Sequence, residues 1–246
     1  MWIYVCGDND RSYYLREEAL HRGHCVTCPD DADWVVLPLP QSAVSEQLKA
    51  HLHRGVHLLC GLVDENLERE AKANGWKLHY IYRDEKYQWQ NSMDSAEGAV
   101  YALMREAPFT LRGKTALIIG YGKLGTALKM HLEGAGVQAI VAARNPVQRE
   151  SAGEDSLDIA KALEQMGDFD LIVNTVPAQI IGRSALEKIK PGAVLMDTAS
   201  SPYGFHLEEA LALRIKAFRE NGIPGRYCPK TAALRLLDCM ERGWGT

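Results

Sequence analysis

The feature that most constrains this chain is a glycine motif placed between an apolar strand and an amphipathic helix. Residues 115–128 read TALIIGYGKLGTAL, with glycines at positions 120, 122 and 125. Alone, G-x-G-x-x-G is a weak signal, but a preceding strand and a following helix are the context in which it binds a dinucleotide. Gly120 permits the tight turn, Gly122 lets the backbone approach a pyrophosphate, and Gly125 lets the helix pack on the strand. The motif predicts a Rossmann domain; a glycine-rich turn without a ligand is the alternative.

The rest of the chain repeats this alternation of apolar runs and helix-length amphipathic segments, which is typical of βα units and parallel sheets. We therefore predict an α/β protein with two doubly wound parallel-sheet domains. A flavodoxin-like domain is expected over residues 1–95. A Rossmann domain with its connector helix is expected over 96–228. Segment 229–246 is expected to form a helix that packs back on the first domain.

The hydrophobic pattern also places the individual elements. In the first half, strands are predicted at 2–6, 24–27, 34–37, 56–61 and 77–82, and helices at 11–22, 42–53 and 65–73. In the second half, a connector helix is predicted at 96–106, strands at 115–119, 138–142, 170–175, 193–197 and 215–218, and a closing helix at 231–240. Asp64 is the predicted cap of helix 65–73, and Gly75 its end.

Charge and composition exclude several classes of protein. The net charge of −4, with both signs mixed along the chain, argues against a nucleic-acid partner. No apolar run is long enough to cross a membrane, and the N-terminal residues do not resemble a signal peptide, so we expect a soluble cytoplasmic protein. Cys25 and Cys28 form a lone C-x-x-C without a second pair, so no metal site is expected.

The strand that follows the glycine motif carries the signal for the cofactor. An NAD enzyme would place Asp or Glu near Ala142 or Ala143, where the ribose hydroxyls are bound, but this chain continues with Arg144 and Asn145. A guanidinium binds a 2′-phosphate through charge-assisted hydrogen bonds. NADP is therefore the predicted cofactor, with Arg149 a second cation nearby. A solvated Arg144 is the alternative.

Two further strand ends are expected to face the nicotinamide, because ligands bind outside the carboxyl ends of parallel strands. They are the segments Asn174-Thr175-Val176-Pro177 and Asp197-Thr198-Ala199-Ser200. Capping of the following helices is the alternative for these side chains. The full set of predicted cofactor-binding residues is Gly120, Gly122, Lys123, Leu124, Gly125, Arg144, Asn145, Thr175, Pro177, Asp197 and Ser200.

Several stretches resemble the dipicolinate synthase A family. They are Asn91-Ser92 followed by Ala96-Glu97-Gly98, Ala142-Ala143-Arg144, the two segments after strands 170–175 and 193–197, and residues 222–232, GIPGRYCPKTA. The resemblance implies oxidation of dihydrodipicolinate, formed from 4-hydroxy-tetrahydrodipicolinate, to dipicolinate with NADP during sporulation. It also implies a partner B subunit. One departure concerns residues 203–206: the family usually has two glycines and an acidic residue here, and this chain has YGFH.

Substrate and catalytic residues are less sharply indicated. Predicted substrate contacts are Asn91, Ser92, Arg226 and Thr231, with Arg83 a further cation that could hold a carboxylate. Lys230 follows Pro229 at an expected helix start, where an anion is favoured. Glu97 is a catalytic candidate with Lys230, although Asp94-Ser95-Ala96-Glu97 also resembles a capping box. The His–carboxylate pair of 2-hydroxyacid dehydrogenases has no counterpart that we can place.

Two other functions stay open at this point. One is an NADP-dependent dehydrogenase of another small carboxylated substrate, on the same two-domain frame. The other is an NADP(H)-binding subunit without catalysis of its own. Whether the chain forms a homo-oligomer is also open.

Overall fold

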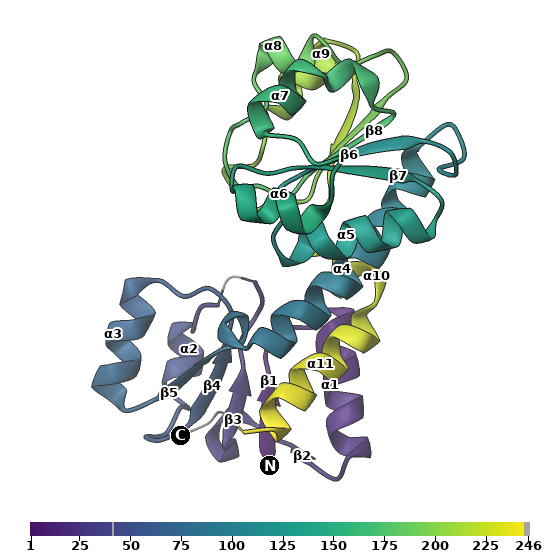
Figure 1. The fold of residues 1–246 in the computed structure, drawn as a ribbon. Coiled ribbons are helices and arrows are strands. Elements are labelled where there is room, and N and C mark those ends of the chain that lie inside the picture. The colour runs from purple at the N-terminus through teal and green to yellow at the C-terminus, as the bar shows by residue number, and fades with distance from the viewer. Residues whose placement is uncertain (41, 244–246) are drawn as a thin grey trace. The chain divides into compact units, whose positions relative to one another are not determined.

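The computed structural model describes residues 1–40 and 42–243, and the chain divides into two compact units. Unit 1 joins Met1–Asn91 to Pro224–Thr246, and unit 2 covers Ser92–Ile223. Each unit contains a five-stranded parallel sheet with helices on both faces, as Figure 1 shows. The predicted α/β class with two doubly wound parallel sheets is confirmed. The last three residues of the predicted segment 229–246 lie outside the described residues.

The elements of unit 1 alternate between strand and helix. In chain order they are β1 (Trp2–Val5), α1 (Asp10–His21), β2 (Cys25–Val26), η1 (Pro29–Asp31), β3 (Trp34–Val36), α2 (Glu46–Lys49), β4 (His57–Cys60), α3 (Glu65–Asn74), β5 (Lys77–Tyr80), η2 (Ile81–Arg83) and α11 (Pro229–Glu241). Helices α4 (Glu85–Glu106) and α10 (Ile223–Tyr227) run across the two boundaries between the units.

Unit 2 repeats the alternation. Its elements are β6 (Thr115–Ile119), α5 (Lys123–Gly134), β7 (Gln138–Ala142), α6 (Pro146–Ala152), α7 (Ile159–Glu164), η3 (Met166–Asp168), β8 (Leu171–Asn174), α8 (Arg183–Leu186), β9 (Val194–Asp197), α9 (Leu207–Ala212) and β10 (Lys216–Arg219).

The sheet of unit 1 has the order β2-β1-β3-β4-β5, which is the order of flavodoxin-like folds. Successive residues of a strand point to opposite faces, so a sheet covered on both faces needs apolar residues at every position. Strand β3 satisfies this requirement. Trp34 and Val36 belong to the cluster that includes α1 and α11, while Val35 and Leu37 belong to the cluster that includes α3.

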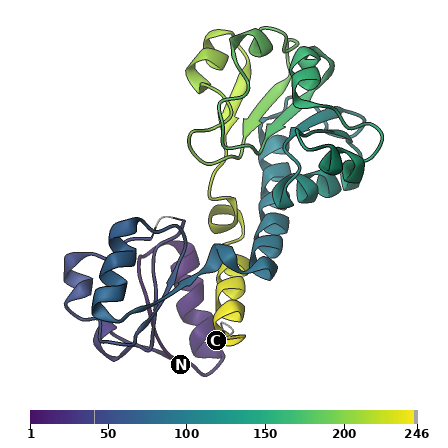
Figure 2. The same ribbon diagram turned by 60° about the vertical axis from the view of Figure 1, so that its left-hand side comes forward.

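Helix α11 completes the core of unit 1 although it comes from the other end of the chain. It lies along α1 in Figure 2, and Leu236, Leu237 and Met240 are buried there. The Arg22 guanidinium adds ion pairs of 2.7 Å to Asp238 and to Glu241 at the edge of this contact. The apolar contact supplies most of the stabilisation, because partly exposed ion pairs contribute little.

The sheet of unit 2 has the order β10-β9-β8-β6-β7. A single parallel bridge extends it beyond β7, where Leu157 accepts a hydrogen bond from the amide of Ala143 and donates one to the carbonyl of Val141. If the bridge at Leu157 is counted as the third strand, the order is the 3-2-1-4-5-6 of a Rossmann domain. The strand order reverses between β6 and β8, and dinucleotides bind across such a reversal.

Two predicted helices are wrong in extent. The helix expected over 42–53 is shorter in the structure, where only α2 forms. Ser42 lies outside the helix because its hydroxyl donates to the Pro38 carbonyl and accepts from the amide of Gly61. The helix begins later, with Ser45 as its N-cap. The connector helix expected at 96–106 starts earlier, at Glu85, where the Asp84 carboxylate accepts from the amide of Tyr87. The predicted helix 65–73 matches α3, with Asp64 as its N-cap and Gly75 left-handed at its end.

Within the described ranges 1–40 and 42–243, no helix is long and apolar enough to span a bilayer. In the same ranges, no three His, Cys, Asp or Glu side chains gather as a metal site. Both cysteines of the C-x-x-C are exposed: Cys25 lies in β2, and Cys28 precedes η1 and donates to Asp31.

Two histidines stack against each other in unit 1, beside a tryptophan. The rings of His57 and His79 are parallel within 4° with centroids 4.9 Å apart, and Trp34 is 4.7 Å from each. One hydrogen bond of 2.9 Å joins His57 Nδ1 to His79 Nε2. Burial, with His57 and Lys77 nearby, lowers the pKa of His79 to about 4. Burial and Lys77 also lower the pKa of His57, against the opposing effect of Asp33.

We expect unit 1 to lose stability as the pH falls from about 6.5 towards 4. In that window His79 binds a proton in the unfolded chain but not in the folded one, so the free energy of unfolding decreases as pH decreases. Urea unfolding followed by circular dichroism between pH 7 and pH 4.5 measures the effect. His79→Gln should flatten the dependence, whereas His21→Gln, at an exposed position, should retain it. Equal slopes for His79→Gln and the parent chain would contradict the assignment.

Candidate cofactor site

The turn between β6 and α5 is built on close approaches that only glycine allows. Gly120 has φ +101°, and a Cβ atom there would lie 2.4 Å from Thr175 Oγ1. A Cβ atom on Gly125 would lie 2.1 Å from the carbonyl oxygen of Gly120. Gly122 differs, because apart from Gly122 itself and its two chain neighbours no protein atom lies within 4 Å of the place its Cβ would take. This turn therefore has the glycine roles expected of a pyrophosphate site, with open space at Gly122.

A cleft of about 410 Å³ opens beside this turn, entirely within unit 2. Its lining residues are Gly120, Tyr121, Gly122, Lys123, Leu124, Gly125, Ala143, Arg144, Asn145, Gln148, Ile159, Thr175, Val176 and Pro177. Every predicted cofactor-binding residue except Asp197 and Ser200 is in this lining. The cleft lies at the carboxyl ends of β6, β7 and β8, where the strand order reverses.

The charges of the lining favour an anion. Lys123 and Arg144 are exposed cations of the lining, and the lining contains no carboxylate. Amide groups at the start of α5 add partial positive charge, because the first turn of a helix leaves its N–H groups without intrahelical partners. Asn145 lies beside Arg144 and caps α6 by accepting from the amide of Val147 at 2.9 Å. The lining thus suits a dinucleotide, whose phosphates the start of α5 would favour.

Sequence reasoning missed Gln148 and Ile159 in this lining. Gln148 lies on α6, and Ile159 begins α7, after the bridge at Leu157. Neither residue belongs to a motif, so only the folded path of residues 143–159 brings them to the cleft. Tyr121, Ala143 and Val176 are direct neighbours of predicted residues, and the motifs could have indicated them.

Asp197, one of the predicted cofactor-binding residues, does not line the cleft. It is fully buried, and its Oδ1 accepts from Asn174 Nδ2 at 2.8 Å and from the amide of Ala199 at 3.1 Å. Its Oδ2 accepts from the amide of Gly204 at 2.7 Å. Asp197 instead holds the loop that follows β9 against the end of β8. Ser200 is an exposed residue of this loop.

The segment that departs from the dipicolinate synthase pattern, residues 203–206, is well accommodated in this loop. Phe205 is fully buried in the core of unit 2. Tyr203 has φ +66°, an uncommon conformation for a residue other than glycine, and the Arg219 guanidinium lies 3.8 Å over its ring. Arg219 also donates to the carbonyl of Phe205 at 3.2 Å. This loop is therefore held by a packed phenylalanine and by a cation–π contact.

The other predicted site residues do not line this cleft. Asn91, Ser92 and Glu97 all lie on α4, where Ser92 is buried and Glu97 is exposed. The capping box proposed for Asp94 and Glu97 is wrong, because both residues lie in the interior of α4.

The predicted substrate residues near the C-terminus belong to unit 1. Arg226 and Lys230 are exposed, and Thr231 is half-buried near the start of α11. Arg226 lies 5.5 Å from the centroid of the Tyr227 ring. Arg83 is also exposed, and its guanidinium lies 4.0 Å over the ring of Tyr80.

Comparison with known families agrees with this geometry. Residues 79–216 match the NAD binding domain of the D-isomer specific 2-hydroxyacid dehydrogenases, and the chain belongs to this family. The match extends from the end of β5 to the start of β10 and includes the whole cleft. The cofactor class that the glycine turn predicts, a nicotinamide dinucleotide, is therefore confirmed.

Individual relatives refine the comparison. The dipicolinate synthase A protein of Bacillus subtilis is 26% identical over 181 residues, which cover 72% of this chain and 60% of that relative. The crystal structure of dipicolinate synthase A from Bacillus halodurans matches 98% of this chain and 96% of its own, with a TM-score of 0.85 at 20% identity. The apo D-lactate dehydrogenase of Escherichia coli matches with a TM-score of 0.64 at 16% identity. The resemblance to dipicolinate synthase A is thus confirmed.

We expect Gly125→Ala to weaken dinucleotide binding and to destabilise unit 2 by about 1–3 kcal/mol, because the new methyl group has to displace the Gly120 carbonyl. Gly134→Ala is the matched control on the same helix, since no atom outside the adjoining helix backbone and chain neighbours lies within 4 Å of its Cβ position, and it should be neutral or stabilising. Thermal unfolding and fluorescence titration with NADPH and NADH measure both effects. Unchanged binding in Gly125→Ala would show that the turn does not hold the pyrophosphate.

Proposed function

We propose that this chain is an NADP-dependent oxidoreductase of the dipicolinate synthase A type, which oxidises dihydrodipicolinate to dipicolinate. The observation that carries the proposal is the lining of the cleft in unit 2: a glycine turn with open space for a pyrophosphate, next to Arg144 in a lining without carboxylates. The similarity to dipicolinate synthase A supports the choice of substrate.

The preference for NADP rests on the residues at the end of β7. An acidic side chain at this strand end would accept hydrogen bonds from the ribose of NAD and repel a 2′-phosphate. Here β7 ends at Ala142 and is followed by Ala143, both buried, and the next side chain is the exposed guanidinium of Arg144. A guanidinium forms paired, charge-assisted hydrogen bonds with phosphate. The nearby acidic Asp158 is already paired with Arg149 at 3.2 Å.

The reaction removes a hydride and a proton from dihydrodipicolinate and leaves an aromatic ring. A nicotinamide cofactor would supply the hydride acceptor, so the protein's own residues have to position the substrate, accept the proton and exclude water. Our candidates for binding the two carboxylates of the substrate are Arg226, Thr231, Asn91 and Ser92. Glu97 and Lys230 are our candidates for proton transfer, and both side chains are exposed. A B subunit is the proposed partner, because the Bacillus subtilis relative is named as one subunit of its enzyme.

We expect Arg144→Ala to weaken NADPH binding by about tenfold to a hundredfold and to leave NADH binding nearly unchanged. The reason is that a hydrogen bond to a charged group contributes about 1.5–3 kcal/mol, and each 1.4 kcal/mol is about tenfold in affinity. Fluorescence titration of both cofactors measures the ratio. Arg183→Ala removes an equal charge from α8, where Arg183 pairs with Glu187, and should leave the ratio as it is. Equal affinities for NADPH and NADH in the parent chain would refute the NADP preference.

The proposed reaction is tested with 4-hydroxy-tetrahydrodipicolinate and NADP, by this chain alone and with a dipicolinate synthase B subunit. We expect dipicolinate and NADPH to appear in equal amounts, faster than without protein, and Gly125→Ala to reduce both. Chromatography quantifies dipicolinate, and absorbance quantifies NADPH. If NADPH binds but neither product forms under either condition, the substrate assignment fails while the cofactor site stands.

A further inference from the structure

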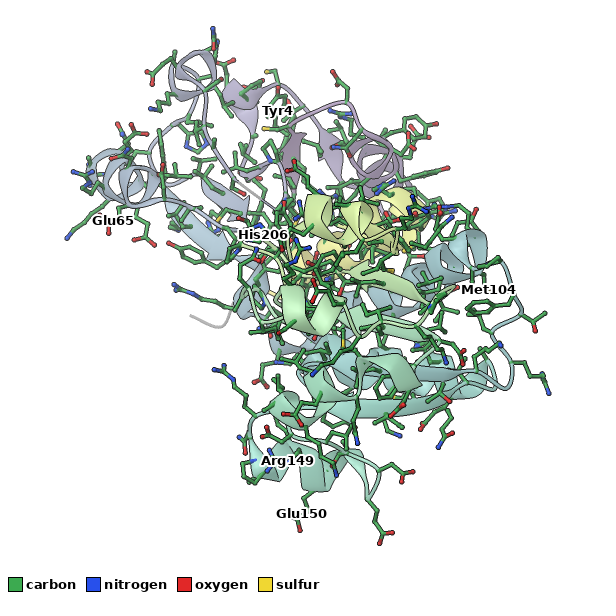
Figure 3. All side chains as sticks on the ribbon, turned by 90° about the horizontal axis from the view of Figure 1, so that it is seen from above. Tyr4, Glu65, Met104, Arg149, Glu150 and His206 are labelled. Atoms are coloured by element: carbon green, nitrogen blue, oxygen red, sulfur yellow. The ribbon has the colours of Figure 1, made fainter. Side chains whose placement is uncertain are left out.

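Arg149 has an unusual set of partners for a surface arginine of a short helix. It lies on α6, and its Nη1 donates to the carbonyls of Ala143 and Arg144, each at 2.9 Å. The same Nη1 lies 3.2 Å from Asp158 Oδ2. In Figure 3, Arg149 and its neighbour Glu150 are both labelled, and Glu150 extends away from the ribbon. The guanidinium of Arg149 is therefore held by the loop that carries Arg144.

The partner Asp158 is itself fixed in place. Its Oδ1 accepts from the amide of Ala160 at 2.9 Å and so caps α7. Leu157, the preceding residue, forms the bridge to β7. Ser156 donates from its Oγ to the carbonyl of Arg149 at 2.9 Å. Residues 156–158 thus form a fixed support behind the loop, and Arg149 connects the loop to this support.

The contacts of Arg149 matter for an anion bound at this loop. Carbonyl oxygens carry partial negative charge, and those of Ala143 and Arg144 would repel a phosphate if they turned towards it. Because Arg149 binds both oxygens, they stay directed at its guanidinium, and the side chain of Arg144 is left to line the cleft. Neither Arg149 nor Asp158 lines the cleft.

We propose that Arg149 is a positioning residue for cofactor selectivity: by binding the carbonyls of Ala143 and Arg144, it fixes the loop in the form in which Arg144 recognises the 2′-phosphate. This inference rests on the NADP preference proposed above. In this proposal Arg149 does not contact the 2′-phosphate itself. All three contacts are made by the single nitrogen Nη1, so the arrangement requires a positively charged nitrogen donor at this place, and the ammonium of lysine can supply one.

The test uses two fragments that differ only in the 2′-phosphate, adenosine 2′,5′-bisphosphate and 5′-AMP. Calorimetric titration of the full chain gives both affinities for the parent, Arg149→Gln, Arg149→Lys, Arg144→Ala and the double variant Arg144→Ala with Arg149→Gln. Arg183→Gln is the charge-matched control on α8. Thermal unfolding confirms that each variant is folded.

We expect Arg149→Gln to lower the affinity for adenosine 2′,5′-bisphosphate about tenfold and that for 5′-AMP by less than about twofold, whereas Arg149→Lys, which keeps a charged donor, should retain most of the selectivity. Because Arg149 acts through Arg144, the double variant should bind the bisphosphate no more weakly than Arg144→Ala alone. Arg183→Gln should match the parent chain.

Three outcomes would overturn the assignment. Full selectivity in Arg149→Gln would show that the contacts of Arg149 with the loop are not needed. Additive losses in the double variant would indicate that Arg149 contacts the phosphate directly. Equal losses for both fragments would indicate general loosening of the loop. Failure of the proposed NADP preference has a different signature, because the parent chain would then bind the two fragments equally.

Discussion

The contact on which the rest of the site depends is the one between α5 and the turn that precedes it. The absence of a side chain at Gly125 lets the helix approach the Gly120 carbonyl, where a Cβ atom would come within 2.1 Å. Gly120 in turn lies against Thr175, whose hydroxyl donates to the carbonyl of Ile119 at 3.0 Å. These contacts join the ends of β6 and β8, the two strands between which the strand order reverses. As a result, the N-terminus of α5 faces the side of the turn where the absence of a side chain at Gly122 leaves open space.

The two sheets of the chain show that this strand order alone does not create a site. In unit 1 the strand order also reverses beside its first strand, between β1 and β3, yet the cavity there is only about 10 Å³. The protein's own arginines occupy this edge. Arg16 donates to the carbonyls of Val5 and Gly7 at 2.7 and 2.6 Å, and Arg11 donates to that of Leu39 at 3.2 Å. Arginine side chains satisfy the strand ends of unit 1, whereas unit 2 has glycines that leave room for a ligand.

The sequence predicted those features whose cause is local. The strands, the cap of α3 at Asp64 and the glycine turn depend on residues within a few positions, and the structure has them where expected. The start of α4 was missed because Asp94, a good capping residue, lies inside a longer helix begun by Asp84. The role of Asp197 was missed because its partner Gly204 comes from a loop whose path depends on the burial of Phe205. Sequence patterns do not record such long-range burial.

The features that distinguish the cleft of this chain lie in the loops after β7, β8 and β9. The sheet and the glycine turn provide a binding site for a dinucleotide, and they are compatible with many reactions. The loop after β7 presents Arg144 in place of a carboxylate, and Arg149 holds its backbone. The loops after β8 and β9 are joined by the buried pair Asn174 and Asp197, so a change in one loop has to be accommodated by the other. Because a buried pair that loses one partner is costly, these two loops are expected to vary together rather than singly.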